Sequence, residues 1–368
     1  MKRCWIYAAT IAVVAISFGC SDKKKSEISN TQAPPPAIQG LAAVPANATT
    51  VIGIDVAALA GSQVADRALQ RLYAREPRLQ ATLAQVLQAC EIRPEHDLAS
   101  VTIAIVPTAA RVDSLLVAKG KFEQGKLISC LGKSLGKLGS HLETSEFEGR
   151  PIYHEVRSGP GVSGPGVSGP GVWLTFGSAD TVLLSSGREA LVEALGVGAK
   201  VSNTPSGVGQ YLSRAQTDAD LWVLHRIDPV VGEGLIAAAG GHIQAPIGVI
   251  ASADLSGGLI LNVELEMRSE DDAKALILQA KSQLEAVALV LQIDSLGRMV
   301  QKAELAAEGH QATLRWSLNE EELTDLIGAN LSDLSTSIDK NGANDENPAP
   351  VRNGNSETET KREIEDGN

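Results

Sequence analysis

The 368-residue chain has few aromatic side chains and few basic ones. Phe, Trp and Tyr make up 3% of the residues, whereas 43% are hydrophobic, so the core must consist mainly of Leu, Val, Ile and Ala. Lys and Arg number 32 against 44 Asp and Glu, which gives a formal net charge of −12. An acidic chain without a basic stripe is repelled by phosphate backbones. The composition therefore argues against nucleic acid as a partner.

The sequence also lacks the motifs that mark common active sites. It contains no HExxH, P-loop, GxSxG or strand-linked GxGxxG pattern. The six histidines share no metal-ligand spacing, and the stretch Asp339–Gly342 departs from a calcium loop because its Gly stands at the fourth place. We therefore expect no enzymatic activity, no metal and no cofactor.

Two groups of residues are weaker candidates for chemistry or ligand binding. His225 lies near Asp228 at the end of an expected strand, but Asp228 is better explained as a helix N-cap. Isolated aromatic residues could line a ligand pocket, although they more often pack in a core or on a sheet face. These residues are Trp173, Trp222 and Trp316.

Cysteine is scarce, with four residues in the whole chain. Cys4 and Cys20 belong to the N-terminal segment, which leaves Cys90 and Cys130 as an even pair. In an oxidising compartment such a pair predicts one disulfide, and two buried thiols are the alternative. No CxxC is present, and Cys130 lies on an apolar helical stripe, which argues against a redox, zinc or nucleophilic role.

The N-terminal hydrophobic run is too short to span a bilayer comfortably. Lys2 and Arg3 precede an apolar stretch over residues 5–18, and Gly19 and Cys20 follow it. A spanning helix needs about 20 apolar residues, whereas a basic start, a short apolar run and a small residue are typical of a secretory signal. Residues 1–19 are therefore predicted to be a signal peptide.

This segment resembles the signal of bacterial lipoproteins, in which a lipobox ends at a Cys that is acylated and becomes the new N-terminus. Ser17 departs from that pattern, because the family usually has Leu three places before the Cys. The resemblance implies a lipid, such as palmitate, on Cys20 and a membrane anchor in the cell envelope. Ser21 resembles an outer-membrane rather than an inner-membrane sorting signal. The alternative is an ordinary signal peptide cleaved nearby, which would give a secreted protein.

Composition divides the rest of the chain into segments. Residues 20–44 have no apolar period and contain runs of Lys and Pro, so they are predicted to be a disordered tether. Two folded segments are expected, at 45–200 and 201–330. A Ser-Gly-Pro-Gly-Val sequence repeated over 158–172 is expected to form a surface loop, and the acidic tail at 331–368 is expected to be disordered.

Hydrophobic periodicity predicts an α+β fold built from two copies of a β-α-β-β-α-β-β unit, which is similar to a split β-α-β unit. The first copy begins near Thr49 and the second near Asp220, with antiparallel sheets covered by helices on one face. Helix starts are expected at Ser62, Pro77 and Ser269, the last with Asp272 in a capping box. A further helix is expected over 205–215 and the longest over 269–291.

These observations predict a cell-envelope lipoprotein that acts as a non-enzymatic binding or interaction module. Its partners would be the membrane, through the N-terminal lipid, and an unidentified protein or apolar ligand. One alternative is a periplasmic carrier of an apolar ligand or lipid. Another is an enzyme whose site is assembled from residues far apart in the sequence.

Overall fold

The computed structural model describes residues 36–109, 111–136, 139–157, 171–228, 232, 244–290 and 294–328. Several sequence predictions lie outside these residues. They are the signal segment, lipidation of Cys20, most of the Ser-Gly-Pro-Gly-Val repeat, the helix expected after Asp228, and the tail.

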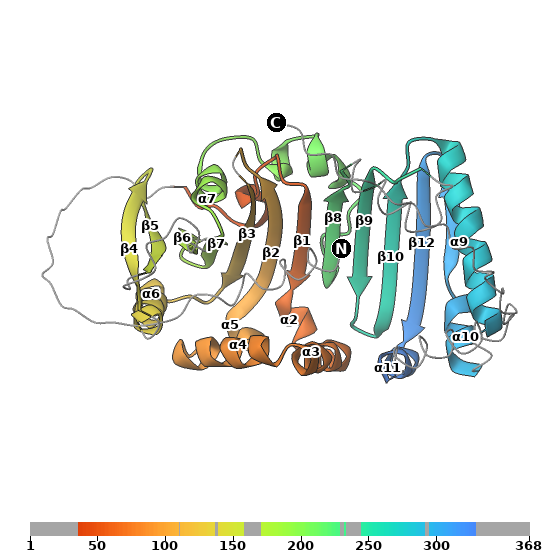
Figure 1. Ribbon diagram of the computed structural model, residues 1–368, viewed down its shortest axis with the longest axis horizontal. Helices are drawn as coiled ribbons and strands as arrows, with labels where there is room; N and C mark the ends of the chain where they lie inside the picture. The colour runs from red at the N-terminus through yellow and green to blue at the C-terminus, as the bar shows by residue number, and fades with distance from the viewer. Residues whose placement is uncertain are drawn as a thin grey trace, which may run out of the picture. The chain divides into compact units, whose positions relative to one another are not determined.

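Twelve strands form one sheet, and each pair of neighbours is antiparallel (Figure 1). In chain order they are β1 (Thr50–Asp55), β2 (Leu98–Pro107), β3 (Val112–Gly120), β4 (Ser140–Phe147), β5 (Arg150–Arg157), β6 (Trp173–Ser178), β7 (Thr181–Ser185), β8 (Leu221–Arg226), β9 (Gly248–Asp254), β10 (Gly258–Glu266), β11 (Glu304–Glu308) and β12 (Gln311–Asn319). Across the sheet the order is β11-β12-β10-β9-β8-β1-β2-β3-β7-β6-β5-β4.

The described helices connect or flank these strands (Figure 1). The α-helices are α2 (Val56–Leu59), α3 (Gln63–Arg75), α4 (Pro77–Ala89), α5 (Pro94–Asp97), α6 (Gln124–Leu135), α7 (Arg188–Leu195), α9 (Glu270–Val290), α10 (Asp294–Gln301) and α11 (Glu320–Gly328). The 3-10 helices are η1 (Gly40–Ala43), η3 (Val201–Asn203) and η4 (Gly207–Tyr211). A mixed fold with a large antiparallel sheet, as the α+β prediction requires, is confirmed.

The two predicted segments share one sheet instead of forming separate sheets. Strand β1 of the first segment pairs with β8 of the second, from Thr50 opposite His225 to Ile54 opposite Leu221. Burial alternates along both strands, as in a pleated sheet whose two faces differ. The sheet is therefore continuous across the junction between the two segments.

One face of the central strands forms the main hydrophobic core. Alternate residues such as Val51, Leu115 and Leu224 are fully buried there, against side chains from η1, α7, η3 and η4. Ile52 and Val223, on the opposite face, are only half-buried. The period of two along each strand thus separates a fully covered face from a partly covered one.

Local capping chemistry agrees with the sequence in several places. Ser62 Oγ accepts a hydrogen bond from the Ala65 amide at 3.3 Å at the start of α3. Ser269 Oγ accepts from the Asp272 amide at 3.1 Å and donates to its carboxylate at 2.6 Å, at the start of α9. Helix α4 begins at Pro77. These predicted helix starts are confirmed.

Two local predictions differ from the structure. The expected helix over 205–215 is instead the short 3-10 helix η4, because Gly207 has a φ of +61° and Gly209 lies close to the Thr204 carbonyl. The described part of α9 ends at Val290, and a further helix, α10, begins at Asp294, which periodicity did not indicate.

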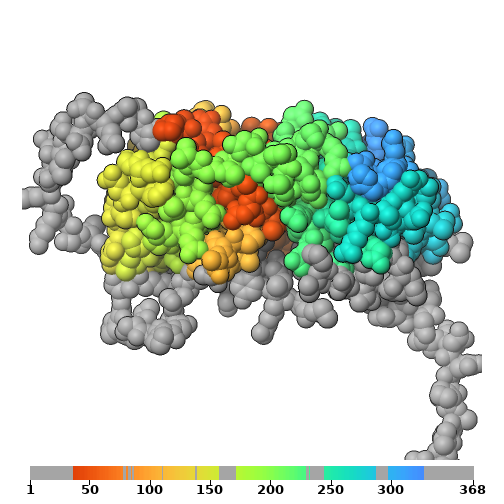
Figure 2. All heavy atoms as spheres, turned by 90° about the horizontal axis from the view of Figure 1, so that it is seen from above, coloured from red at the N-terminus to blue at the C-terminus, as the bar shows by residue number. Residues whose placement is uncertain are grey.

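The described fold begins earlier than residue 45, the expected boundary of the tether. Ala43 and Val44 are fully buried, and η1 packs against α7 and η3; Figure 2 shows red N-terminal atoms beside green ones. Arg150 holds this stretch by donating hydrogen bonds to the carbonyls of Phe176 and Gly177, at 3.1 and 3.0 Å, and to the carbonyl of Pro36. Aliphatic burial and one buried guanidinium therefore join residues 36–44 to the folded body.

Candidate functional site

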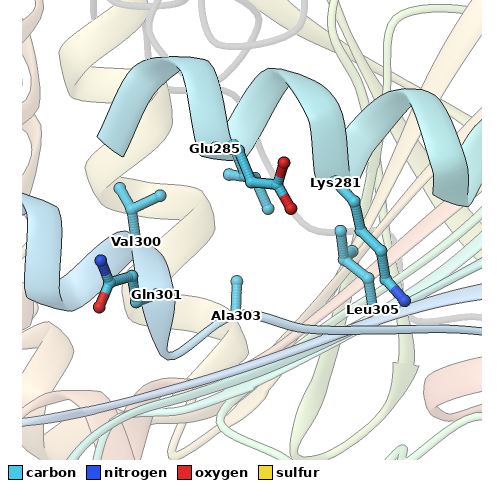
Figure 3. A pocket seen from close by; sticks show the side chains of 7 residues that line it. Lys281, Glu285, Val300, Gln301, Ala303 and Leu305 are labelled. Atoms are coloured by element: carbon cyan, nitrogen blue, oxygen red, sulfur yellow. The ribbon is translucent and has the colours of Figure 1, made fainter. Parts of the chain in front are cut away.

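A pocket of about 470 Å³ lies between α9, α10 and β11 (Figure 3). Helix α9 has 21 residues, and its first part packs on the sheet through Ala273 and Ile277. Helix α10 also contacts α9, and residues of both helices and of β11 line the pocket.

The pocket has an apolar floor and a polar mouth. Its lining residues are Lys281, Leu284, Glu285, Val300, Gln301, Ala303 and Leu305. The aliphatic members are half-buried, whereas the three polar ones are exposed. A volume of several hundred Å³ with apolar walls and a few polar groups is typical of a site for a small organic ligand.

The α10 wall of the pocket is fixed from behind. Trp316 on β12 donates a hydrogen bond from Nε1 to the carbonyl oxygen of Met299 at 2.7 Å. Lys302, which follows α10, pairs with Glu322 of α11 at 2.6 Å. Met299 is itself buried in the cluster that contains Leu318 and Leu323. Val300 and Gln301 are therefore presented from a well-supported turn of helix.

The two charged residues at the mouth lie one helical turn apart and do not pair with each other. Figure 3 shows the ammonium group of Lys281 and the carboxylate of Glu285 lying apart. Within the described residues neither of them forms an ion pair. Lys274 and Glu270, earlier on α9, do pair, at 2.6 Å, and their hydrogen bond raises the pKa of Lys274 and lowers that of Glu270. The mouth thus presents separate positive and negative charges.

The sequence-based candidates His225 and Asp228 have other surroundings. The Nδ1 atom of His225 lies 2.8 Å from Thr50 Oγ1, across the β1–β8 pair. Burial lowers the pKa of His225, and a hydrogen bond with the Thr49 backbone opposes this effect. The carbonyl oxygen of Asp228 accepts a hydrogen bond from the Gly232 amide at 2.8 Å, the geometry of a helical turn. Neither residue lines the pocket.

The three candidate tryptophans lie on separate strands. Trp173 stacks on His154 with ring centroids 4.5 Å apart, Trp222 is buried in the main core, and Trp316 supports α10 as described above. These are packing roles. None of the three residues lines the pocket.

Cys90 and Cys130 are joined by a disulfide, with their Cα atoms 5.3 Å apart. The bond links the residue after α4 to the middle of α6, and Cys130 is buried on its helix. Its sulfur is therefore held in a covalent link, which leaves no thiol for nucleophilic chemistry.

Two polar clusters elsewhere on the sheet were not anticipated. On the edge strand β4 and its neighbour β5, Glu143 lies 3.3 Å from Nε2 of His141 and 3.4 Å from Nε2 of His154. The alternating spacing of His141 and Glu143 is the only sequence signal, since His154 joins them through strand pairing. Throughout the described ranges, no group of three or more His, Cys, Asp or Glu residues is arranged to hold a metal ion.

The second cluster centres on Arg214, which lies after η4 and faces two carboxylates of β10. Arg214 pairs with Glu264 at 2.6 Å and also with Glu266, and its guanidinium carbon lies 5.5 Å from the ring centroid of Tyr211. Burial raises the pKa of Glu264, whereas the charge of Arg214 acts in the opposite direction. The cluster ties the loop after η4 to the sheet.

Sequence reasoning missed the pocket because its lining comes from α9, α10 and β11, which only tertiary packing brings together. Lys281, Leu284 and Glu285 look like an ordinary helix surface, and Val300 belongs to a helix that was not expected.

No described helix is both long enough and apolar enough to cross a membrane.

Comparison with known proteins adds little information about the role of these residues. No family model and no curated protein matches the chain. Among solved structures, crystal forms I, III and IV of the treponemal protein TP0453 align with it at TM-scores of 0.42, 0.42 and 0.41. Sequence identities are 9%, 10% and 10%, over 79–81% of this chain and 98–99% of the other. Similarity at this level establishes neither a common fold nor a function.

Proposed function

We propose that the protein is a lipid-anchored component of the bacterial cell envelope that acts as a non-enzymatic binding module. The observation that carries the proposal is the N-terminal sequence: a basic start, a short apolar run, and Gly19 before Cys20. Such a segment exports the chain and supplies a lipid attachment point. Membrane association through this lipid, with the outer membrane favoured by Ser21, is part of the proposal.

The test is the intact mass and detergent partitioning of the protein purified from its native membranes. A mature chain that starts at Cys20, carries diacylglycerol and loses it on Cys20→Ala is the expected result. Cys4→Ala is the matched control, because Cys4 lies within the expected leader and should leave mass and partitioning unchanged. A water-soluble chain cut at another residue would contradict the anchor and favour a secreted binder.

The second candidate function is a carrier of an apolar ligand or lipid. It is favoured by the pocket beneath α9, whose floor is aliphatic and whose volume suits a small organic molecule. Solvent extraction of the purified protein followed by mass spectrometry should then release an apolar compound in stoichiometric amount. A purified protein that releases no apolar compound on extraction and binds no added lipid would contradict the carrier function.

We also infer that the body arose by duplication of a β-α-β-β-α-β-β unit with its helices on one face of the sheet. In support, the strands that follow β1 outward are β2, β3 and then β7, and those that follow β8 are β9, β10 and then β12. In each series a helix follows the third strand, α6 in one and α9 in the other. Superposing β1–β3 with α6 on β8–β10 with α9 tests the inference, and helices on opposite faces would contradict it.

A further inference from the structure

The pocket between α9, α10 and β11 combines an apolar floor with one cation and one anion that have no ion-pair partner in the described chain. From this combination we propose that it binds a zwitterionic amphiphile with a single hydrocarbon chain, of the lysophosphatidylethanolamine class. The proposal rests on the carrier function above and names its ligand.

The head group is assigned from the two charges at the mouth. Lys281 and Glu285 are four residues apart on α9, a spacing that places their side chains on the same face with Cβ atoms about 6 Å apart. A phosphoethanolamine group carries an anion and a cation separated by a two-carbon link, so both can be paired at once. The phosphate would meet Lys281 and the ammonium would meet Glu285.

The order of these residues explains why the pair is open to a ligand. Lys before Glu at this spacing is the weaker orientation for an ion pair within a helix, whereas Glu270 before Lys274 is the stronger one and is paired at 2.6 Å. A ligand with both charges therefore competes with little internal pairing. An anionic or cationic head group would satisfy only one of the two residues.

The hydrocarbon chain is assigned from the floor. Leu284, Ala303 and Leu305 contribute only aliphatic atoms and are half-buried, so covering them removes apolar surface from water. A volume of about 470 Å³ suits one chain of moderate length rather than a diacyl lipid. Ala303 is the smallest of the three residues, so enlarging it would obstruct the floor directly.

The experiment is native mass spectrometry of the full-length protein, purified from membranes in a non-ionic detergent and mixed with a single-chain probe. The probe is lysophosphatidylethanolamine with a 14-carbon chain, compared with lysophosphatidylglycerol and a fatty acid of the same length. We expect one adduct with the zwitterionic probe, at an affinity about two- to fivefold above that of the two anionic probes. The denatured mass of the same sample reports the lipid on Cys20, so failure of the anchor and failure of ligand binding are read separately.

Variants locate the site. Lys281→Gln should lower binding of all three probes, whereas Glu285→Gln should lower only that of the zwitterionic probe and remove the preference. Ala303→Phe should abolish the adduct. Lys274→Gln and Glu270→Gln, on the same helix outside the pocket, are the matched controls and should change nothing. Equal binding of all head groups, or an adduct that survives Ala303→Phe in a protein with wild-type circular dichroism, would overturn the proposal.

Discussion

Gly53 of β1 lies directly opposite Trp222 of β8, and the indole covers the glycine so closely that a β-carbon there would come within 2.0 Å of the ring. This contact sits at the junction of the two halves of the sheet. Trp222 is only 6% exposed and belongs to the main core. The absence of a side chain at residue 53 therefore makes room for the largest side chain of the adjoining strand.

Gly53→Ala should destabilise the fold by about 1–3 kcal/mol, because the indole has to move within a close-packed core. Gly61→Ala is the matched control, since a β-carbon at Gly61 would meet nothing within 4 Å. Urea unfolding measures both. Combining Gly53→Ala with Trp222→Leu should recover part of the loss, and strictly additive effects would contradict the contact.

Stability should depend on the protonation of His225. Burial lowers the pKa of this residue in the fold, so the unfolded chain binds a proton more readily than the folded one. The stabilisation from neutral His225 is present above the ordinary pKa of about 6.5 and is lost as the pH falls below it. The variant His225→Gln keeps a polar partner for Thr50. We expect its melting temperature to fall less between pH 7.5 and pH 5.5 than that of the wild type. Equal losses would show that His225 does not contribute.

Arg214→Ala should destabilise the protein by about 1–3 kcal/mol at pH 7.5, because it leaves Glu264 and Glu266 side by side without their cation. Burial already raises the pKa of Glu264, so the folded protein holds a proton on this residue more readily than the unfolded chain does. Stability tied to the protonated form is present at low pH and lost as the pH rises through the raised pKa. The damage in Arg214→Ala should therefore be smaller at pH 5 than at pH 7.5.

The double variant Arg214→Ala with Glu264→Gln is the companion measurement. It removes one of the two facing charges and should be more stable at pH 7.5 than Arg214→Ala alone. Chemical denaturation at both pH values measures these differences. A single variant that is equally destabilised at pH 5 and pH 7.5 would contradict the role assigned to the cluster.

Breaking the bond between Cys90 and Cys130 should lower the free energy of unfolding. The two residues are 40 apart in sequence, and closing a loop of that size stabilises a fold by up to about 4 kcal/mol. Urea unfolding of the wild type with and without reductant measures the effect. Replacing both cysteines by alanine should give the lower stability with and without reductant. If reductant leaves the free energy of unfolding of the wild type unchanged although alkylation shows that both thiols are free, the disulfide does not stabilise the fold.

Much of the secondary structure is readable from local patterns. Alternation along Leu259–Met267 indicates a strand, and the Ser269–Asp272 pair fixes the beginning of α9. The turn at Glu148 and Gly149 joins β4 and β5, with φ values of 49° and 75°. These features depend on residues within a few positions of one another, so the sequence alone specifies them.

The features that sequence could not supply depend on contacts between distant residues. The pairing of β1 with β8 brings together residues such as Thr50 and His225, and no local pattern encodes that register. The pocket depends on how α9, α10 and β11 pack together, which local sequence patterns do not specify. Likewise, Ala43 and Val44 are ordinary in sequence and become core residues only because η3 and α7 lie against them.

The hydrogen bond from Arg150 to the carbonyl of Pro36 limits how far the body could lie from a lipid on Cys20. If Cys20 carries the proposed lipid, about 16 residues separate it from Pro36, whose carbonyl is bonded to the body. A fully extended chain covers at most about 3.6 Å per residue, so the fixed point would stay within roughly 60 Å of the membrane surface. A molecule anchored in this way would stay in a thin layer beside its own bilayer. Lengthening the segment between Cys20 and Pro36, rather than altering the sheet, would widen its range.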